Sequence, residues 1–401
     1  MLLPLLTAAL LAADSLPEPP PREGAGAATP AISVHRQPAI PLVALRVALL
    51  AADPPGYAGA GHLVQHLVHS GLAERAALVG GRVQIERTAD AVVFTLTGPA
   101  AELGYLAEIL RTALRPGLPA EGALLRASRE LAEERLAEWE TAERHVRSAL
   151  RVRLFPADVS AAGTELSAAR LAEGDAVRRA WAQMYRPERV TITAVGDVTL
   201  DQIRAAFGDL PPAADVPPGR VLRDTVSAAP LAPAEATRAW VGAGFAASGI
   251  DPAVLNVVTR IAGNRLRQRL PGATLATGEH WWTHHGQALV LIASVPGARL
   301  AEAQRAVGAT LTGAAGDLTE AEVAEAARAI RRELLFYSRT PDRMAALLGQ
   351  FWDRTGDPDE GQRFYDRLGT VSLREVRQAL NTLAGRTPAR VDVPPQRLMR
   401  R

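Results

Sequence analysis

The chain alternates between short β-favouring runs and longer stretches with helical periodicity. Residues 31–53 alternate between apolar and polar positions and then become continuously apolar, which predicts a pair of strands. Residues 80–98, GGRVQIERTADAVVFTLTG, predict a β-hairpin because small and polar residues separate two β-favouring runs. A helix opened by Gly59 and Gly61 is expected to carry His62 and His66, and further helical segments are expected at 100–115 and 121–154.

A similar order of elements recurs after a proline-rich segment. Residues 185–198 predict a strand after a helix end, and Thr199 predicts the cap of the next amphipathic helix. Prolines then interrupt the pattern at 211–233, which predicts a linker between a first domain at 31–210 and a second at 234–401. Two copies of a unit in which strands precede helices favour an α+β fold.

Composition narrows the function classes. The 45 basic and 43 acidic residues give a net charge of +2 and are interleaved along the chain, which argues against a nucleic-acid-binding surface. The absence of cysteine excludes a thiol nucleophile, a disulfide framework and a thiolate metal site.

The first 30 residues have the composition of a targeting segment. MLLPLLTAALLAADS is a short apolar run that ends in small residues, and a proline-rich spacer follows it. The run resembles a secretory signal and is too short to span a bilayer. It predicts a periplasmic or secreted protein, and no other stretch of the sequence predicts a membrane span.

The segment GHLVQH carries the candidate chemistry. His62 and His66 are four residues apart, so a helix places both imidazoles on one face, where they could bind one metal ion or form a polar surface. The pattern resembles the inverted zinc-peptidase motif H-x-x-E-H, in which the Glu accepts a proton from metal-bound water. Gln65 stands at the position of that Glu, and a neutral amide does not accept the proton.

Longer segments extend the resemblance to one family. AGHLVQHLVHSG resembles the zinc-binding box of the insulinase (pitrilysin) metallopeptidase family, which includes mitochondrial processing peptidase subunits. The hairpin at 80–98 looks like that family's edge-strand hairpin, residues 163–211 are similar to its helix, Tyr-x-Pro, Gly-Asp strand and following helix, and 244–270 look like the start of its second domain. The resemblance implies two homologous domains, each a mostly antiparallel sheet packed with helices.

The family resemblance also implies a zinc ion held by His62, His66 and a downstream Glu. Glu143 lies at the usual family distance from the motif. However, the segment between the motif and the hairpin is shorter than usual, which moves the expected ligand back to Arg135, whose guanidinium cannot bind zinc. Glu134 is then the nearest substitute, so Glu134 and Glu143 remain alternatives.

Two further features of the family concern peptides. An edge strand binds extended peptides through its backbone, which implies a peptide-binding role for residues Gln84, Ile85, Glu86 and Arg87. An Arg and a Tyr in the second domain hold the substrate carbonyl, and Pro271 and Thr277 replace them in this sequence.

These departures favour a catalytically impaired subunit. We expect it to pair with an active insulinase-like subunit or a second copy of itself and to help enclose peptides. One alternative is a zinc endopeptidase with a variant H-x-x-Q-H site, and another is a stand-alone peptide-binding scaffold. In EHWWTHHG, His280 and His284 share one face of a predicted strand, which is compatible with a chamber wall or a second metal site.

Overall fold

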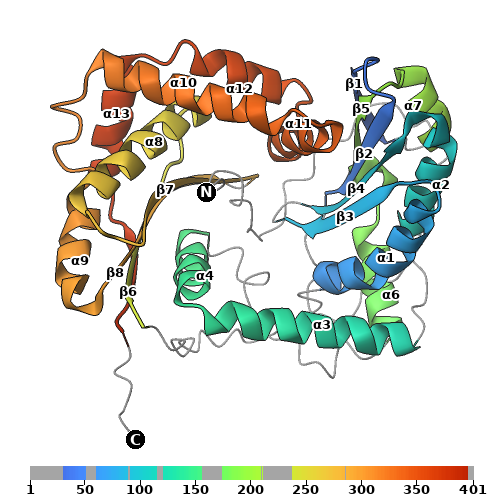
Figure 1. Cartoon of the computed structure of the whole chain (residues 1–401), viewed down its shortest axis with the longest axis horizontal. Coiled ribbons are helices and arrows are strands. Elements are labelled where there is room, and N and C mark those ends of the chain that lie inside the picture. The colour runs from blue at the N-terminus through green and yellow to red at the C-terminus, as the bar shows by residue number, and fades with distance from the viewer. Residues whose placement is uncertain are drawn as a thin grey trace, which may run out of the picture.

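The protein folds into two β-sheets, each covered by helices (Figure 1). This confirms the expected α+β fold with two mostly antiparallel sheets. The computed structural model describes residues 30–50, 60–88, 91–114, 121–155, 174–208, 210, 237–284 and 286–395. The predicted linker at 211–233 and the signal-like segment up to residue 29 lie outside these residues. Within them, no helix is both long and apolar enough to span a bilayer.

The first sheet contains five strands in the order β1-β5-β2-β4-β3, and only the pairing of β1 with β5 is parallel. Their bounds are β1 Ala31–Arg36, β2 Leu42–Leu49, β3 Arg82–Arg87, β4 Val92–Pro99 and β5 Val190–Gly196. The hairpin prediction is confirmed. The predicted pairing of the first two strands with each other is wrong, because β5 lies between them. Every residue of β2 after Leu42 is buried. Strands β4 and β5, which come from later parts of the sequence, pair with its two edges.

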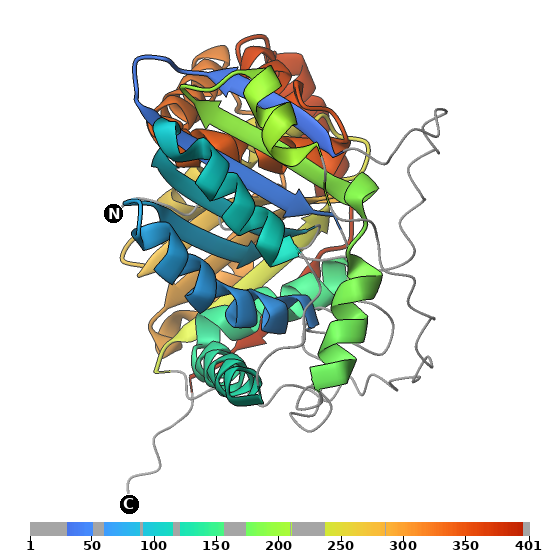
Figure 2. The same cartoon turned by 90° about the vertical axis from the view of Figure 1, so that its right-hand side faces the viewer.

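Helices cover one face of the first sheet, and α1 and α2 lie across it in blue and teal in Figure 2. A capping box between Thr199 and Gln202 starts α7, as the sequence predicted. The helix predicted at 121–154 is divided in two, because Thr141 leaves the helical conformation and caps a new helix. The bounds are α1 Ala60–Ala77, α2 Leu103–Leu114, α3 Glu121–Glu140, α4 Ala142–Leu154, α6 Gly174–Met184 and α7 Leu200–Phe207.

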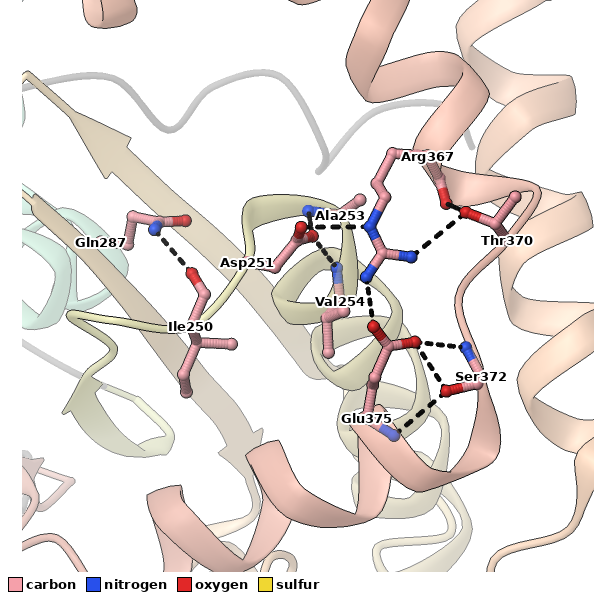
Figure 3. Close-up of polar contacts among 9 residues, drawn as sticks. All are labelled: Ile250, Asp251, Ala253, Val254, Gln287, Arg367, Thr370, Ser372 and Glu375. Atoms are coloured by element: carbon pink, nitrogen blue, oxygen red, sulfur yellow. Dashed lines mark hydrogen bonds and ion pairs between the residues drawn. The ribbon is translucent and has the colours of Figure 1, made fainter.

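The second sheet has the strand order β7-β8-β6-β9, and all of its pairings are antiparallel. Asp251 caps α8, and Arg367 joins Asp251 to Glu375 at the start of α13 (Figure 3). The bounds are β6 Ala239–Ala246, α8 Pro252–Arg269, β7 Leu275–Thr283, β8 Gly286–Val295, α9 Leu300–Ala309, α10 Glu320–Tyr337, α11 Pro341–Thr355, α12 Glu360–Leu368, α13 Leu373–Ala384 and β9 Ala389–Val393.

The two halves repeat one order of elements and exchange a helix. The order strand, helix, hairpin, helix and long helix runs from β2 to α3 and again from β6 to α10. The next helix of each half then packs on the sheet of the other half: α4 contacts β6 and β9, and α11 contacts β2 and β5. Gly242 and Gly244 of β6 allow this close approach, since a Cβ at either position would lie within 2.6 Å of a side-chain carbon of α4.

A buried ion pair fixes α11 on the first sheet. Residues 43, 45, 47 and 49 of β2 enter the core under α1 and α2, so the alternate residue Arg46 points to the opposite face, toward α11. The side chain of Arg46 is fully buried, and its Nη2 lies 2.5 Å from Asp353 Oδ2. Thr191 donates a hydrogen bond to Asp353 Oδ1 at 3.2 Å. A side chain at Gly349 would clash with the guanidinium, with only 2.3 Å between its Cβ and Arg46 Nη1.

We expect Asp353→Ala to lower the free energy of unfolding by about 3–5 kcal/mol, because it leaves the Arg46 charge buried without its partner. Urea denaturation followed by far-UV circular dichroism measures the loss. Asp359→Ala, at an exposed position just before α12, is the matched control and should change the unfolding free energy little. Equal effects of the two substitutions would contradict this account of the ion pair.

Candidate functional site

Helix α1 places His62 and His66 beside the long helix α3. The helix is anchored by Leu63, which is fully buried in the core of the first half. The two histidines follow on one face, and their ring centroids are 5.1 Å apart. The side chain of His66 is 11% exposed and that of His62 is 30% exposed, so His62 is the more accessible of the two.

Glu134 of α3 completes a group of three possible metal ligands. Its Oε2 lies 3.1 Å from His62 Nε2 and 3.6 Å from His66 Nε2. One ligand atom from each of the three residues falls within 4.8 Å of the others. The distance to His66 exceeds a hydrogen bond, and His66 Nε2 has no hydrogen-bond partner among the described residues. Two imidazoles and a carboxylate form a donor set that suits zinc.

Glu130 was missed by the sequence reasoning. Its Oε2 lies 3.1 Å from Nδ1 of His66. A carboxylate on Nδ1 favours the tautomer in which Nδ1 carries the proton, which leaves Nε2 as the acceptor nitrogen directed toward Glu134. Glu130 and Glu134 are four residues apart on α3, as His62 and His66 are on α1, and this matching spacing was the available signal.

The alternative ligand, Glu143, lies elsewhere in the structure. It is on α4, where its Oε1 accepts hydrogen bonds from Arg147 at 2.8 and 3.0 Å. Arg147 also pairs with Glu279 of β7, a residue that is almost fully buried and that accepts a hydrogen bond from Trp281. Glu143 therefore belongs to the contact that fixes α4 on the second sheet, and the structure does not bring it to the histidines.

Gln65 is turned toward the edge strand. Its Nε2 donates a hydrogen bond of 3.0 Å to the backbone carbonyl of Ile85 on β3. A carboxylate could not form this contact, because an ionised Glu has no proton to donate. The residue at the general-base position thus has its donor group occupied by a structural hydrogen bond.

Strand β3 is the outermost strand of the first sheet, and within the described residues no other strand pairs with its outer edge. Successive residues of an antiparallel strand direct their backbone N–H and C=O groups alternately toward the neighbouring strand and away from it. The backbone N–H of Thr88 donates to the carbonyl of Ala91, so Glu86 and Gln84, two and four residues earlier, also direct their backbone groups toward β4. The backbone groups of Val83, Ile85 and Arg87 therefore point outward, and of the predicted peptide-binding residues only Ile85 and Arg87 present backbone groups to the open edge.

Pro271 and Thr277 occupy the two positions in the second half where the family resemblance implies an Arg and a Tyr. Thr277 is buried in β7, and its hydroxyl contacts the carbonyl of Gly278. The carbonyl of Pro271 accepts a hydrogen bond from Arg299 at 2.7 Å. Neither residue supplies a cation or a phenol at this place.

His280 lines a partly open recess in the second half, together with Trp282 and Phe351. Its ring stacks on Trp282, and its Nε2 lies 3.0 Å from Gln287 Oε1. Gln287 in turn donates to the carbonyl of Ile250 (Figure 3), so its oxygen accepts and His280 Nε2 carries the proton. His284 instead lies 3.1 Å from the carbonyl of Arg354. The two histidines have separate partners and are not part of a metal-ligand group among the described residues.

Comparison with known proteins finds similarity in structure only. No known family profile matches the sequence, and no curated protein matches it. A peptidase M16 inactive domain from Pseudomonas fluorescens superimposes with a TM-score of 0.71 at 14% identity, covering 92% of this chain and 96% of that one. A protease from Helicobacter pylori gives 0.72 at 14%, covering 91% and 97%. The chain has the M16 peptidase fold.

A third structure places the M16 fold within a longer chain. The periplasmic protease PqqL from Escherichia coli gives a TM-score of 0.69 at 12% identity, with 88% of this chain covering 43% of that one. The M16 fold is the one implied by the insulinase-like segments of the sequence, so that expectation is confirmed.

Burial of His280 generates a prediction about pH. Desolvation lowers the pKa of His280 from 6.5 to about 3, and the nearby charge of Arg354 acts in the same direction, while the Gln287 hydrogen bond opposes them. The unfolded chain therefore binds a proton between pH 6.5 and 3 that the folded chain does not bind, and stability falls as pH falls through this window. Between pH 7 and 5 the wild type should lose roughly 1–2 kcal/mol more unfolding free energy than His280→Gln.

Urea titrations at several pH values measure this difference. His69→Gln, at an exposed position on α1, is the control and should follow the wild type. A wild type and a His280→Gln variant with parallel pH profiles would refute the role given to His280.

Proposed function

We propose that this chain is a catalytically impaired M16-fold subunit that binds extended peptides in partnership with an active homologue or with a second copy of itself. The observation that carries the proposal is the hydrogen bond from Gln65 to Ile85. Where a peptidase of this fold needs a proton acceptor beside its metal, this chain has an amide engaged with its own backbone. The missing positioned base alone would lower a hydrolytic rate by about 10²- to 10⁴-fold.

The second half supports the same proposal. Pro271 and Thr277 provide no cation and no phenol to hold a substrate carbonyl. Peptide pairing at a strand edge, in contrast, uses backbone groups and is independent of the catalytic side chains. The outward-facing backbone of β3 is therefore the part of the site that can work without the lost groups.

The proposal also includes an exported location and pairing with a second chain. The signal-like N-terminal segment supports a periplasmic or secreted location. Among proteins of similar structure, one is described as an inactive M16 domain and another as a periplasmic protease. An inactive subunit of this kind would act by closing a peptide chamber with a second, active chain.

A second candidate function is zinc binding, which the group of His62, His66 and Glu134 favours. These residues would hold the ion, and Glu130 would orient His66. Zinc bound there would supply Lewis-acid polarisation of a carbonyl or water. With Gln65 in place of a base, we expect it to stabilise the contact between α1 and α3 more than it supports turnover.

We expect the purified chain to bind extended peptides without cleaving them. Fluorescence anisotropy measures binding, and mass spectrometry after long incubation with zinc measures cleavage. Cleavage that disappears in His62→Ala would contradict the proposal and establish a variant peptidase. Absence of peptide binding, both alone and with a co-expressed homologue, would contradict the peptide-binding role.

For the zinc site, we expect Glu130→Gln to weaken zinc binding by about 10- to 100-fold, because it removes the acceptor that orients His66. Glu133→Gln, on the same helix at an exposed position, should leave the affinity unchanged. Isothermal titration calorimetry on the full chain measures both. Equal affinities of the two variants would show that Glu130 has no role in the site, and no zinc binding in the wild type would exclude the second candidate function.

A further inference from the structure

The recess beside His280 lies where the second half repeats the arrangement that carries the candidate metal group in the first half. It is formed by α8, β7, α10, α11 and α12 (Figure 1). Asn256 and Arg260 are four residues apart on α8, as the two histidines are on α1, and Glu333 of α10 pairs with Arg260. Among the described residues, this place has no group of three metal-binding side chains. The repeat therefore keeps a helix pair beside an edge strand here and changes the side chains.

The recess has an apolar floor and a polar rim. The buried side chains of its lining are Trp282, Ile330, Phe351 and Phe364. The more exposed lining includes Glu333, which pairs with Arg260, and Arg354, whose guanidinium lies 5.6 Å from the ring centre of Trp282. Because charges of both signs surround the opening and aromatic rings form the floor, an uncharged aromatic group suits this recess better than an ion does.

A chain of hydrogen bonds ends at an acceptor in this lining. His280 Nε2 donates to Gln287, so His280 Nδ1 is an acceptor, and it receives a hydrogen bond from Asn256 Nδ2 at 3.4 Å. Both ring nitrogens of His280 are thereby engaged. The remaining polar atom, Asn256 Oδ1, is shielded from bulk water and has no hydrogen-bond partner among the described residues. A donor that reaches this atom would satisfy it.

We propose that the recess binds the ring of a phenol, whose hydroxyl donates to Asn256 Oδ1 while the ring contacts the apolar floor. A phenol is uncharged and carries one donor on an aromatic ring. A carboxylate would instead place an acceptor against Asn256 Oδ1, and an ammonium group would lie close to the cations of Arg260 and Arg354. A free phenol and a tyrosine side chain share this chemistry. The proposal does not depend on peptide pairing at β3.

The experiment compares p-cresol with 4-fluorotoluene, in which fluorine replaces the hydroxyl and no donor remains. Ligand-observed NMR titration of the full chain measures both Kd values. The ratio of the 4-fluorotoluene Kd to the p-cresol Kd should be about tenfold higher in the wild type than in Asn256→Leu, because leucine removes the acceptor at similar volume. Equal ratios in the two proteins would show that Asn256 does not bind the hydroxyl and would overturn the proposal.

Two neighbouring substitutions on α10 locate the bound probes. Leu334 lines the recess, so Leu334→Trp fills it and should raise both Kd values about tenfold or more. Leu335 is 56% exposed and is not part of the lining, so Leu335→Trp should bind both probes as the wild type does. Circular dichroism and thermal melting confirm that each variant is folded. Unchanged binding in folded Leu334→Trp would place the probes elsewhere and overturn the proposal.

A last comparison distinguishes the two sources of the phenol. Acetyl-Gly-Tyr-Gly-amide is titrated beside p-cresol into the wild type and Asn256→Leu. Binding of the tripeptide that weakens in Asn256→Leu would assign the recess to tyrosine side chains, and binding of p-cresol alone would assign it to a free phenol. If neither p-cresol nor 4-fluorotoluene binds the wild type, the recess holds water only and the proposal is wrong. None of these results bears on peptide binding at β3.

Discussion

The exchange of helices between the two halves is the constraint on which the structure depends. Among the residues that the structure describes, each sheet packs one face against helices of its own half and the other face against one helix of the other half. Each exchanged helix carries a buried or nearly buried ion pair: Asp353 with Arg46, and Arg147 with Glu279. Burial of a lone Arg46 would be strongly unfavourable, and its partner lies 307 residues away in the sequence. The first sheet can therefore reach its native state only together with the second half.

The same exchange positions the candidate site. Helix α3 contributes Glu130 and Glu134 and ends one residue before Thr141, where α4 begins. Since α4 packs against β6 and β9, the far end of α3 is tied to the second sheet while its acidic residues meet α1. The distance between the histidines and the carboxylates thus depends on how the two halves are joined. A ligand bridging α1 and α3 would stabilise this joined arrangement.

Local patterns in the sequence predicted local structure well. The hairpin at β3 and β4 and the Thr199 cap both follow from periodicity and capping chemistry. The insertion of β5 between β1 and β2, and the strand β9 near the C-terminus, could not be predicted in this way, because strand partners are chosen by the whole sheet. The motif was enough to predict that His62 and His66 lie together. It could not show that Glu130 reaches these histidines and that Glu143 does not, because this depends on where α3 ends.

The amide of Gln65 affects both the surroundings of the two histidines and the edge of β3. A carboxylate at this position would have no proton to offer the Ile85 carbonyl, and two acceptors facing each other repel. Such a side chain would turn away from the carbonyl of Ile85. The amide reverses this preference, because its N–H finds an acceptor on β3. An amide in place of an acid therefore removes a proton acceptor beside His62 and His66 and adds a hydrogen-bond donor at the edge of β3.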